Sequence, residues 1–267
     1  MIFIKINKIK IVPLFGLIVL VLIFFNCSDV VNDYSTLPRA GFCLTFDDDY
    51  IEEWYSINDL FLTSNVTATF FISDLDSLSQ HEIKLLKELN TFGHEIGSHG
   101  MHHTNAVDYL KNHSLSEYYK YEIHPAINFM DSIGMKPKSF AYPFGRSTDS
   151  LDFFLLNYFN ILRHVTIEQL QPSEKEIDQI DEIYYRFNGE RFVAGLGIDV
   201  NYNISLEELK KVLIRAKREE SVVILFSHRP VDSSPRPYET TIGYLDSLFN
   251  VANELGLKCY KFSDLID

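Results

Sequence analysis

Short apolar segments, rich in β-branched and aromatic residues, alternate with amphipathic segments from residue 40 to residue 262. The apolar segments have the length and composition of buried strands, and the intervening segments repeat apolar residues at helical spacing. The predicted strands are 40–46, 66–72, 94–97, 139–141, one ending at 165, 182–187, 191–198, 222–226 and 257–262. The predicted helices are 51–63, 80–92, 115–133, 240–255 and those beginning at 150 and 205. This alternation predicts a mainly parallel sheet with helices outside it.

Residues 39–267 contain no further segment rich in proline, glycine and serine that would mark a domain boundary. A single domain of the α/β-barrel class suits a stretch of this length. In such folds, chemistry collects at the carboxyl ends of the strands. We therefore expect polar side chains that follow the predicted strands to meet at one end of the sheet.

Polar or turn-forming residues directly follow four of the predicted strands. They are Asp47 and Asp48 after strand 40–46, His99 and His103 after strand 94–97, Pro143-Phe144-Gly145 after strand 139–141, and His228 after strand 222–226. Each has a purely structural interpretation as a turn, a cap or a packed core residue. Their occurrence at four strand ends favours a catalytic interpretation.

One carboxylate and two imidazoles can bind a divalent metal ion. Asp48, His99 and His103 would fill three positions and leave one open for water, as in catalytic rather than structural zinc sites. The second carboxylate, Asp47, is then free to accept a proton. Zinc is the expected ion, and cobalt, nickel, iron or manganese also suit such ligands. His102 is the alternative to His103 as a ligand.

Four segments carry these residues in a fixed order. They are Thr45-Phe46-Asp47-Asp48, Gly93-His94-Glu95-Ile96-Gly97-Ser98-His99 with His103, Ala141-Tyr142-Pro143-Phe144-Gly145, and Leu225-Phe226-Ser227-His228. In order and spacing they resemble the motifs of the polysaccharide deacetylases, the NodB-homology domain of carbohydrate esterase family 4. The resemblance covers about residues 39–267. It implies an α/β fold of the distorted (β/α)7-barrel type and a metal-dependent hydrolase that removes acetyl groups from N- or O-acetylated polysaccharide.

The resemblance also implies roles for single residues. The metal ligands would be Asp48, His99 and His103, the general base Asp47, the general acid His228, and the oxyanion donor the backbone N–H of Phe144. The chemistry agrees, because an amide carbonyl resists water at neutral pH and an amine leaves poorly without a proton.

Aromatic residues near the motifs are candidates for sugar contact. Tyr142, Pro143 and Tyr238 are the residues expected to bind substrate, through rings that can stack on a sugar. The alternative is that these rings fill a core, since 14% of the chain is aromatic.

Several positions depart from the family pattern. Asp49 stands where the family usually has glycine, and Gly100 where it has serine or threonine. Tyr142 occupies the place where many members have an arginine that steadies the catalytic base. The family's Asp-Trp partner motif is also missing, because the one tryptophan of the chain is Trp54.

Arg163 and Asp199 are the candidates to supply the missing support. The departures motivate an alternative function, in which a catalytically impaired protein keeps the fold and binds glycans without turnover. A third possibility is a metal-dependent amidase that acts on a non-sugar amide.

The amino terminus is typical of an export signal. Basic residues precede an uncharged run, Ile11 to Phe25, which is shorter than the roughly 20 residues that span a bilayer. Cys27 follows and resembles the lipid-attachment site of bacterial lipoproteins, although Asn26 departs from the small residue usual there. We expect 1–27 to be a signal peptide of the lipoprotein type, 28–38 a linker and 39–267 the catalytic domain. The protein would then be exported and anchored to the membrane of a bacterial cell envelope, and the alternative is an uncleaved anchor.

The chain is acidic, with 24 Lys and Arg against 37 Asp and Glu and a formal net charge of −13. Binding to nucleic acid depends on cations that meet phosphates, so this charge argues against a nucleic-acid partner. A neutral or cationic acetylated glycan is more compatible. In an exported protein Cys43 and Cys259 can pair, and two separate thiols are the alternative.

Overall fold

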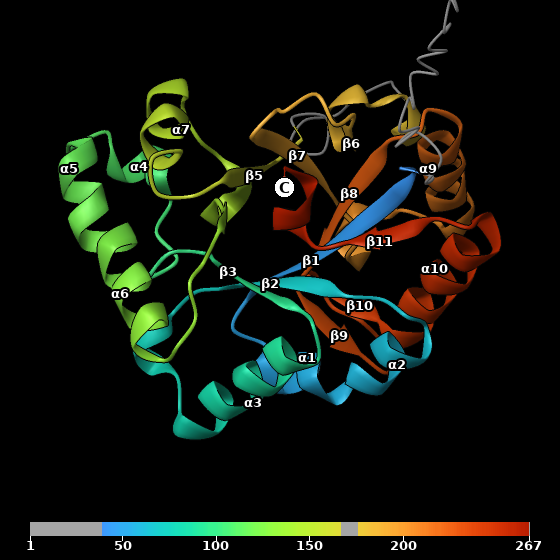
Figure 1. Ribbon diagram of the computed structural model, residues 1–267, viewed down its shortest axis with the longest axis horizontal. Coiled ribbons are helices and arrows are strands. Elements are labelled where there is room, and N and C mark those ends of the chain that lie inside the picture. Colours follow the sequence, from blue (N-terminus) through green and yellow to red (C-terminus); the bar gives the residue numbers. More distant parts are fainter. Residues whose placement is uncertain (1–38, 167–175, 267) are drawn as a thin grey trace, which may run out of the picture. The chain divides into compact units, whose positions relative to one another are not determined.

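Seven parallel strands close into a barrel in the computed structural model, which describes residues 39–166 and 176–266 (Figure 1). They are β1 (Gly41–Asp48), β2 (Ala68–Ile72), β3 (Glu95–Ser98), β4 (Ser139–Ala141), β5 (Ile161–Val165), β7 (Phe192–Gly197) and β8 (Val222–Ser227). Strand β1 pairs in parallel with both β2 and β8, which closes the barrel. The predicted α/β barrel is therefore confirmed. The predicted leader and linker, 1–38, lie outside the described residues.

Short strands extend the barrel sheet and form a second one. Strand β11 (Lys258–Tyr260) runs parallel to the start of β1, and β6 (Tyr184–Tyr185) pairs antiparallel with β8. Strands β9 (Arg229–Val231) and β10 (Glu239–Thr241) form a separate two-stranded sheet. The predicted strand 182–187 is wrong in its first part, because the 3-10 turn Asp181–Ile183 precedes β6.

Helices cover the outside of the barrel. They are α1 (Ile51–Ser56), α2 (Asn58–Thr63), α3 (Gln80–Thr91), α4 (Ala106–Tyr109), α5 (Leu115–Tyr118), α6 (His124–Ser132), α7 (Asp149–Leu155), α9 (Leu206–Arg218) and α10 (Ile242–Leu255). Short 3-10 helices cover Leu75–Ser77, Pro143–Gly145, Ile177–Gln179, Val200–Tyr202 and Phe262–Leu265. Helices α3, α5 and α9 each begin with a capping box in which a serine and a glutamate three residues later exchange hydrogen bonds. Within the described residues, none of the helices combines the length and apolarity needed to span a bilayer.

Two predicted helices are interrupted. The predicted helix 51–63 is divided at Ile57, whose backbone (φ −100°, ψ 11°) departs from helical geometry. The predicted helix 115–133 contains a π-helical segment, Tyr119–Ile123, between α5 and α6. Pro125 is the second residue after this segment, and proline has no N–H and excludes the carbonyl four residues earlier. The N–H of His124 accordingly bonds to the carbonyl of Tyr119, five residues back.

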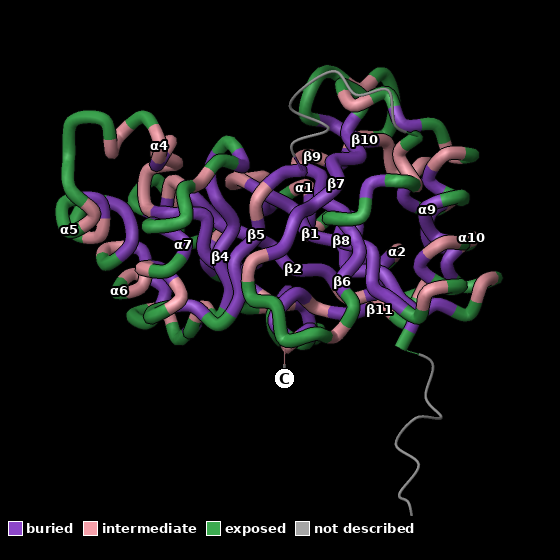
Figure 2. The backbone as a smooth tube through the Cα atoms, turned by 90° about the horizontal axis from the view of Figure 1, so that it is seen from above, coloured by how far each residue is buried: buried purple, intermediate pink, exposed green. Residues whose placement is uncertain are grey.

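Residues alternate between the two faces of the barrel strands. Phe42, Leu44 and Phe46 of β1 belong to the core between the barrel and its helices, whereas Cys43 belongs to the interior cluster with Phe71. Figure 2 shows the buried strands in purple, enclosed by helices whose outer turns are exposed. By this alternation Asp47 falls on the interior face, at the carboxyl end of β1.

The two cysteines of the domain are free thiols. Cys43 pairs in register with Tyr260 and Phe42 with Cys259, so the thiols lie on adjacent strands. The Cys259 thiol donates to the carbonyl of Thr67 at 3.0 Å. The alternative of two separate thiols therefore holds in this structure.

Candidate functional site

The carboxyl ends of β1 and β8 and the loops after β3 and β4 surround a cavity of about 300 Å³. Its lining consists of Asp47, Asp48, His99, His103, Tyr142, Phe144, Gly145, Val165, Tyr202, Phe226, His228 and Tyr238. Residues that the sequence places at four separate strand ends thus share one cavity.

Asp48, His99 and His103 converge within this cavity. Oδ1 of Asp48 lies 3.2 Å from Nε2 of His103 and 3.7 Å from Nε2 of His99. One ligand atom from each residue lies within 4.8 Å of the others. Oδ1 of Asp48 is buried and has no hydrogen-bond partner in the described part of the chain. A carboxylate oxygen without a partner and two imidazole nitrogens at this spacing fit a divalent cation such as zinc.

A hydrogen bond to the backbone orients the imidazole of His99. Its Nδ1 donates to the carbonyl of Ala141, at the end of β4, over 2.8 Å, so the lone pair of Nε2 faces the cluster beside Asp48. Burial lowers the pKa of His99 to about 3, so the ring is neutral at neutral pH. Neutral imidazole is the form that binds metals.

His103, and not His102, joins the cluster. The ring centroids of His103 and His99 lie 4.9 Å apart, and the other neighbour of His103 is the ring of Phe144 at 4.7 Å. The ring of His102 instead contacts Tyr121 at 4.7 Å. The competing ligand of the sequence analysis therefore lies outside the cluster.

Asp47 is held by a buried arginine. Arg163 is fully buried, and its Nη2 donates to Oδ2 of Asp47. The guanidinium also lies 4.6 Å from the ring centre of Phe226. Burial alone would raise the pKa of Asp47, but the charge and the hydrogen bond of Arg163 lower it below its ordinary value. Asp47 is consequently ionised at neutral pH.

Arg163 reaches Asp47 from the strand next to the Ala-Tyr-Pro-Phe-Gly motif. Ala141 and Arg163 are register partners of β4 and β5, and the N–H of Tyr142 donates to the carbonyl of Arg163 over 3.0 Å. The arginine missing at position 142 thus has a counterpart on the neighbouring strand.

His228 is held by Asp199, which is fully buried. The Nδ1 of His228 donates to Oδ2 of Asp199 over 2.7 Å, and the Ser227 hydroxyl donates to Oδ1 over 2.5 Å. Burial alone would lower the pKa of His228, but Asp199 raises it above its ordinary value. Nε2 of His228 is the nitrogen left for a ligand in the cavity. From the other side, Nε1 of Trp54 donates to the carbonyl of His228 over 2.7 Å.

The expected substrate-binding residues divide into two groups. Tyr142 is only 1% exposed and donates its hydroxyl to Asp152 over 2.7 Å, and Pro143 is buried as well. Tyr142 lines the cavity and Pro143 is not among its lining residues, so contact of these two buried residues with a sugar stays a prediction. Tyr238 is 54% exposed and its ring lies 5.3 Å from that of His228. Sequence reasoning missed Tyr202, which lies in a short 3-10 turn without a motif.

Four residues that line the cavity have a left-handed backbone although none is glycine. Their φ angles are 83° for Asp48, 53° for His103, 61° for Phe144 and 66° for Tyr238. Side chains with a Cβ rarely adopt this conformation, and it is retained where the surrounding structure enforces it. Such residues cluster at active sites and ligand clamps, which agrees with a functional cavity here.

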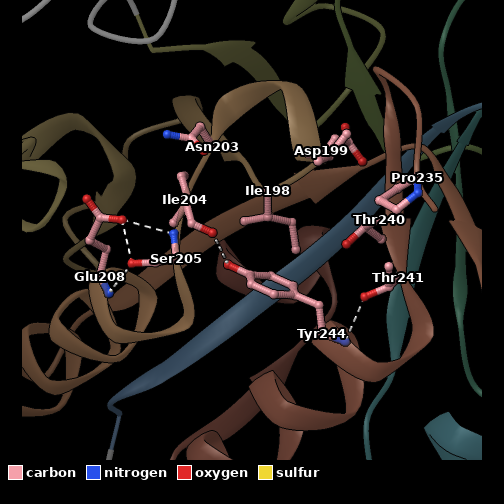
Figure 3. Close-up of a pocket in the computed structure, with 11 residues that line it drawn as sticks. Ile198, Asp199, Asn203, Ile204, Ser205, Glu208, Pro235, Thr240, Thr241 and Tyr244 are labelled. Atoms are coloured by element: carbon pink, nitrogen blue, oxygen red, sulfur yellow. Dashed lines mark hydrogen bonds between the residues drawn. The ribbon is translucent and has the colours of Figure 1, made fainter. Parts of the chain in front are cut away.

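A second cavity of about 300 Å³ is lined by Asp199 together with residues of the segments around Ser205 and Thr241 (Figure 3). Several of its polar groups are engaged with one another. The Tyr244 hydroxyl donates to the carbonyl of Ile204, Thr241 caps α10, and Glu208 bonds to Ser205. We assign no chemistry to this cavity.

Comparisons with known proteins agree with this geometry. Residues 35–157 match a family model described as polysaccharide deacetylase. No curated protein matches the sequence.

Three solved structures illustrate the likeness in fold. The chitin deacetylase of the fungal pathogen Colletotrichum lindemuthianum is 15% identical with a TM-score of 0.56, over 86% of this chain and 88% of that one. A family 4 carbohydrate esterase from Streptomyces lividans, in complex with acetate, is 12% identical with a TM-score of 0.53, over 84% of this chain and 93% of that one. BA3943 from Bacillus anthracis, a pseudoenzyme of the same family, is 16% identical with a TM-score of 0.55, over 85% of this chain and 66% of that one.

Proposed function

We propose that this chain, whose residues 35–157 match the polysaccharide deacetylase family, is a metal-dependent hydrolase of that family that removes acetyl groups from an N- or O-acetylated polysaccharide. The observation that carries the proposal is the convergence of Asp48, His99 and His103 within 4.8 Å, in the cavity that Asp47 and His228 also line. When bound by these three residues, a divalent cation supplies the Lewis acidity that hydrolysis of an acetyl group requires.

Asp47 and His228 handle the protons in this proposal. Asp47, kept ionised by Arg163, accepts the proton of the attacking water. His228, whose protonated form Asp199 favours, gives a proton from Nε2 to the leaving nitrogen or oxygen of the sugar. The backbone N–H of Phe144 donates to the oxyanion of the tetrahedral intermediate.

The exposed rings of Phe144 and Tyr238 are the proposed sugar contacts. Phe144 is 56% exposed beside His103, and Tyr238 lies beside His228, so both rings flank the cavity. Aromatic faces of this kind stack on the apolar face of a pyranose.

A glycan-binding protein without turnover is the second candidate. One pseudoenzyme of the family shares the fold, and position 142 lacks the motif arginine. The pairing of Arg163 with Asp47 weighs against this candidate, because it provides the charge whose absence motivated it.

The test is acetate release from chitooligosaccharides and acetylated xylan by the purified protein loaded with zinc or cobalt. We expect Asp48→Ala to abolish release. His102→Ala, a change to the adjacent histidine outside the cluster, should retain it. Tight metal binding without acetate release across the glycan panel would favour the second candidate, and turnover of small amides alone would point to an amidase.

We infer further that the protein is exported and carries a lipid on Cys27, as the amino-terminal sequence predicts. Cells grown with labelled palmitate should label the wild-type protein and the Cys259→Ala variant, and leave Cys27→Ala unlabelled. An unlabelled wild type would contradict the lipid anchor.

A further inference from the structure

We propose that Glu122 is a positioning residue of the metal centre, which fixes the loop that presents His103. The inference rests on the metal centre of the proposed function. Glu122 lies in the π-helical segment Tyr119–Ile123 and is fully buried, although a carboxylate is costly to bury without partners. Its partners are all in the loop that follows His99.

The carboxylate of Glu122 binds the loop on both sides of His103. Oε1 accepts from the backbone N–H of Thr104 over 2.9 Å and from that of His102 over 3.2 Å. Oε2 accepts from the hydroxyl of Thr104 over 3.0 Å. The carbonyl of Glu122 also accepts from the N–H of Met101 over 3.1 Å. The residues before and after His103 are thereby fixed to one side chain.

These contacts suit an ionised carboxylate. Every group that faces the two oxygens of Glu122 is a donor, and an ionised carboxylate only accepts hydrogen bonds. Hydrogen bonds to a charged acceptor are stronger than those between neutral groups. His103 itself has a φ of 53°, which is unfavourable for a residue with a Cβ. The bonds to its neighbours oppose relaxation of this turn and hold Nε2 of His103 near Asp48.

Gly100 supports the same interpretation. It has a φ of +89°, and a Cβ at this position would lie 2.2 Å from Oε1 of Glu122. The family usually has serine or threonine at this position, and here the carboxylate of Glu122 occupies the space of that side chain. The loop therefore has a charged acceptor from another element in place of a hydroxyl of its own.

The π-helical segment coincides with this contact. It places an additional residue in the helical turn that contains Glu122, and single π turns inside helices are rare and frequently accompany functional sites. The sequence contains a weak signal as well. Glu122 falls at four-residue spacing between Tyr118 and Ala126, two buried residues of the same helical face.

The test compares zinc affinity in two isosteric variants, measured by titration against a competing chelator. Glu122→Gln keeps the volume but directs an amide NH2 at donors of the loop. We expect it to bind zinc 10- to 100-fold more weakly, the usual effect of removing a group that orients a metal ligand. The control is Glu95→Gln at the amino end of β3. The Glu95 carboxylate likewise accepts from a backbone N–H, that of Ser263, and from hydroxyls of Thr69 and Ser139.

Glu95→Gln should lower stability without weakening zinc binding, because Glu95 has no contact with the loop of His103. Equal zinc affinity of wild type and Glu122→Gln overturns the inference, and so does an equal loss in Glu95→Gln. Should Glu122→Gln fail to fold, Thr104→Val removes one bond to Glu122 and should weaken zinc binding to a smaller degree, while Thr104→Ser restores it. Unchanged affinity in Thr104→Val then overturns the inference. A wild type that binds no zinc defeats the proposed metal centre, and the inference with it.

Discussion

At the level of single residues, two buried ion pairs set the charges of the groups proposed to exchange protons. Arg163 holds Asp47, and Asp199 holds His228. Burial disfavours the charged form of both Asp47 and His228, and the paired residue restores it. The two pairs thus favour the ionised form of Asp47 and the protonated form of His228, the states that a general base and a general acid need.

Arg163→Met should reduce acetate release far more than zinc binding. Without the guanidinium, Asp47 stays buried without its strongest cationic partner, and burial favours the neutral acid, which accepts no proton. We expect kcat to fall roughly 100-fold or more. Zinc affinity should persist, because Asp48, His99 and His103 are untouched. Arg163→Lys, which keeps the charge, should retain more activity. An unchanged kcat in Arg163→Met would show that Asp47 does not depend on this cation.

Asp199→Asn should move the alkaline limb of the pH–rate profile. The proposed acid works only when His228 is protonated, so activity falls as pH rises through the pKa of His228. Asp199 raises this pKa above 6.5, and Asp47 and Asp48 on the cavity side add to the effect. Removing one of these charges lowers the pKa, and the fall in activity begins at lower pH. Ser227→Ala removes a neutral hydrogen bond to Asp199 and should leave the limb in place. An unshifted limb in Asp199→Asn would exclude His228 as the acid.

At the level of elements, the alternation of the strands decides which side chains fill the barrel interior. In β3 the inward position beside the cavity is Gly97, where a Cβ would lie 2.5 Å from the ring of Phe71 and 2.7 Å from the hydroxyl of Ser139. The interior leaves no room for a methyl group at this level. The ring of Phe71 occupies the space, and the guanidinium of Arg163 packs against it at 5.5 Å.

Gly97→Ala should therefore lower the free energy of unfolding by about 1–3 kcal/mol, the usual cost of overpacking. Urea denaturation measures this difference. Gly243→Ala in α10 is the matched control, because no atom lies within 4 Å of the added Cβ. It should raise the free energy of unfolding by up to about 1 kcal/mol, since alanine favours helix over glycine. Equal stability of Gly97→Ala and wild type would contradict this prediction, because it would mean that Phe71 and Ser139 can move to make room for the methyl group at no cost in free energy.

At the level of the whole molecule, the sequence predicts the order of the elements and which strand ends meet. The sequence predicts that Asp47 and His228 lie in one site, because apolar runs show where the strands end and the carboxyl ends of parallel strands meet at one end of the barrel. The sequence does not predict the burial of Tyr142, because its hydroxyl is satisfied by Asp152, ten residues away in another element. The π-helical segment and the loop contact of Glu122 likewise arise from packing between distant segments. Arg163 is a candidate from the sequence to support the catalytic base, but its pairing with Asp47, 116 residues away, is seen only in the structure.

The proposed metal centre also joins distant parts of the chain, since Asp48 ends β1 while His99 and His103 follow β3. The unfolded chain does not hold these three ligands together, so zinc should bind the native state alone. Binding to the native state alone raises the free energy of unfolding by about 2.7 kcal/mol when free zinc is 100 times its Kd. The melting temperature, followed by calorimetry, should therefore rise with zinc concentration and return to its starting value with EDTA.

Asp48→Ala isolates the contribution of the metal centre to this stability. The variant lacks one ligand, so its melting temperature should be the same in zinc and in EDTA, whatever its stability relative to wild type. His102→Ala leaves the cluster intact and should show the full zinc-dependent rise. A wild type that melts at one temperature in excess zinc and in EDTA would contradict zinc binding by Asp48, His99 and His103. A rise that persists in Asp48→Ala would place the bound zinc elsewhere on the chain.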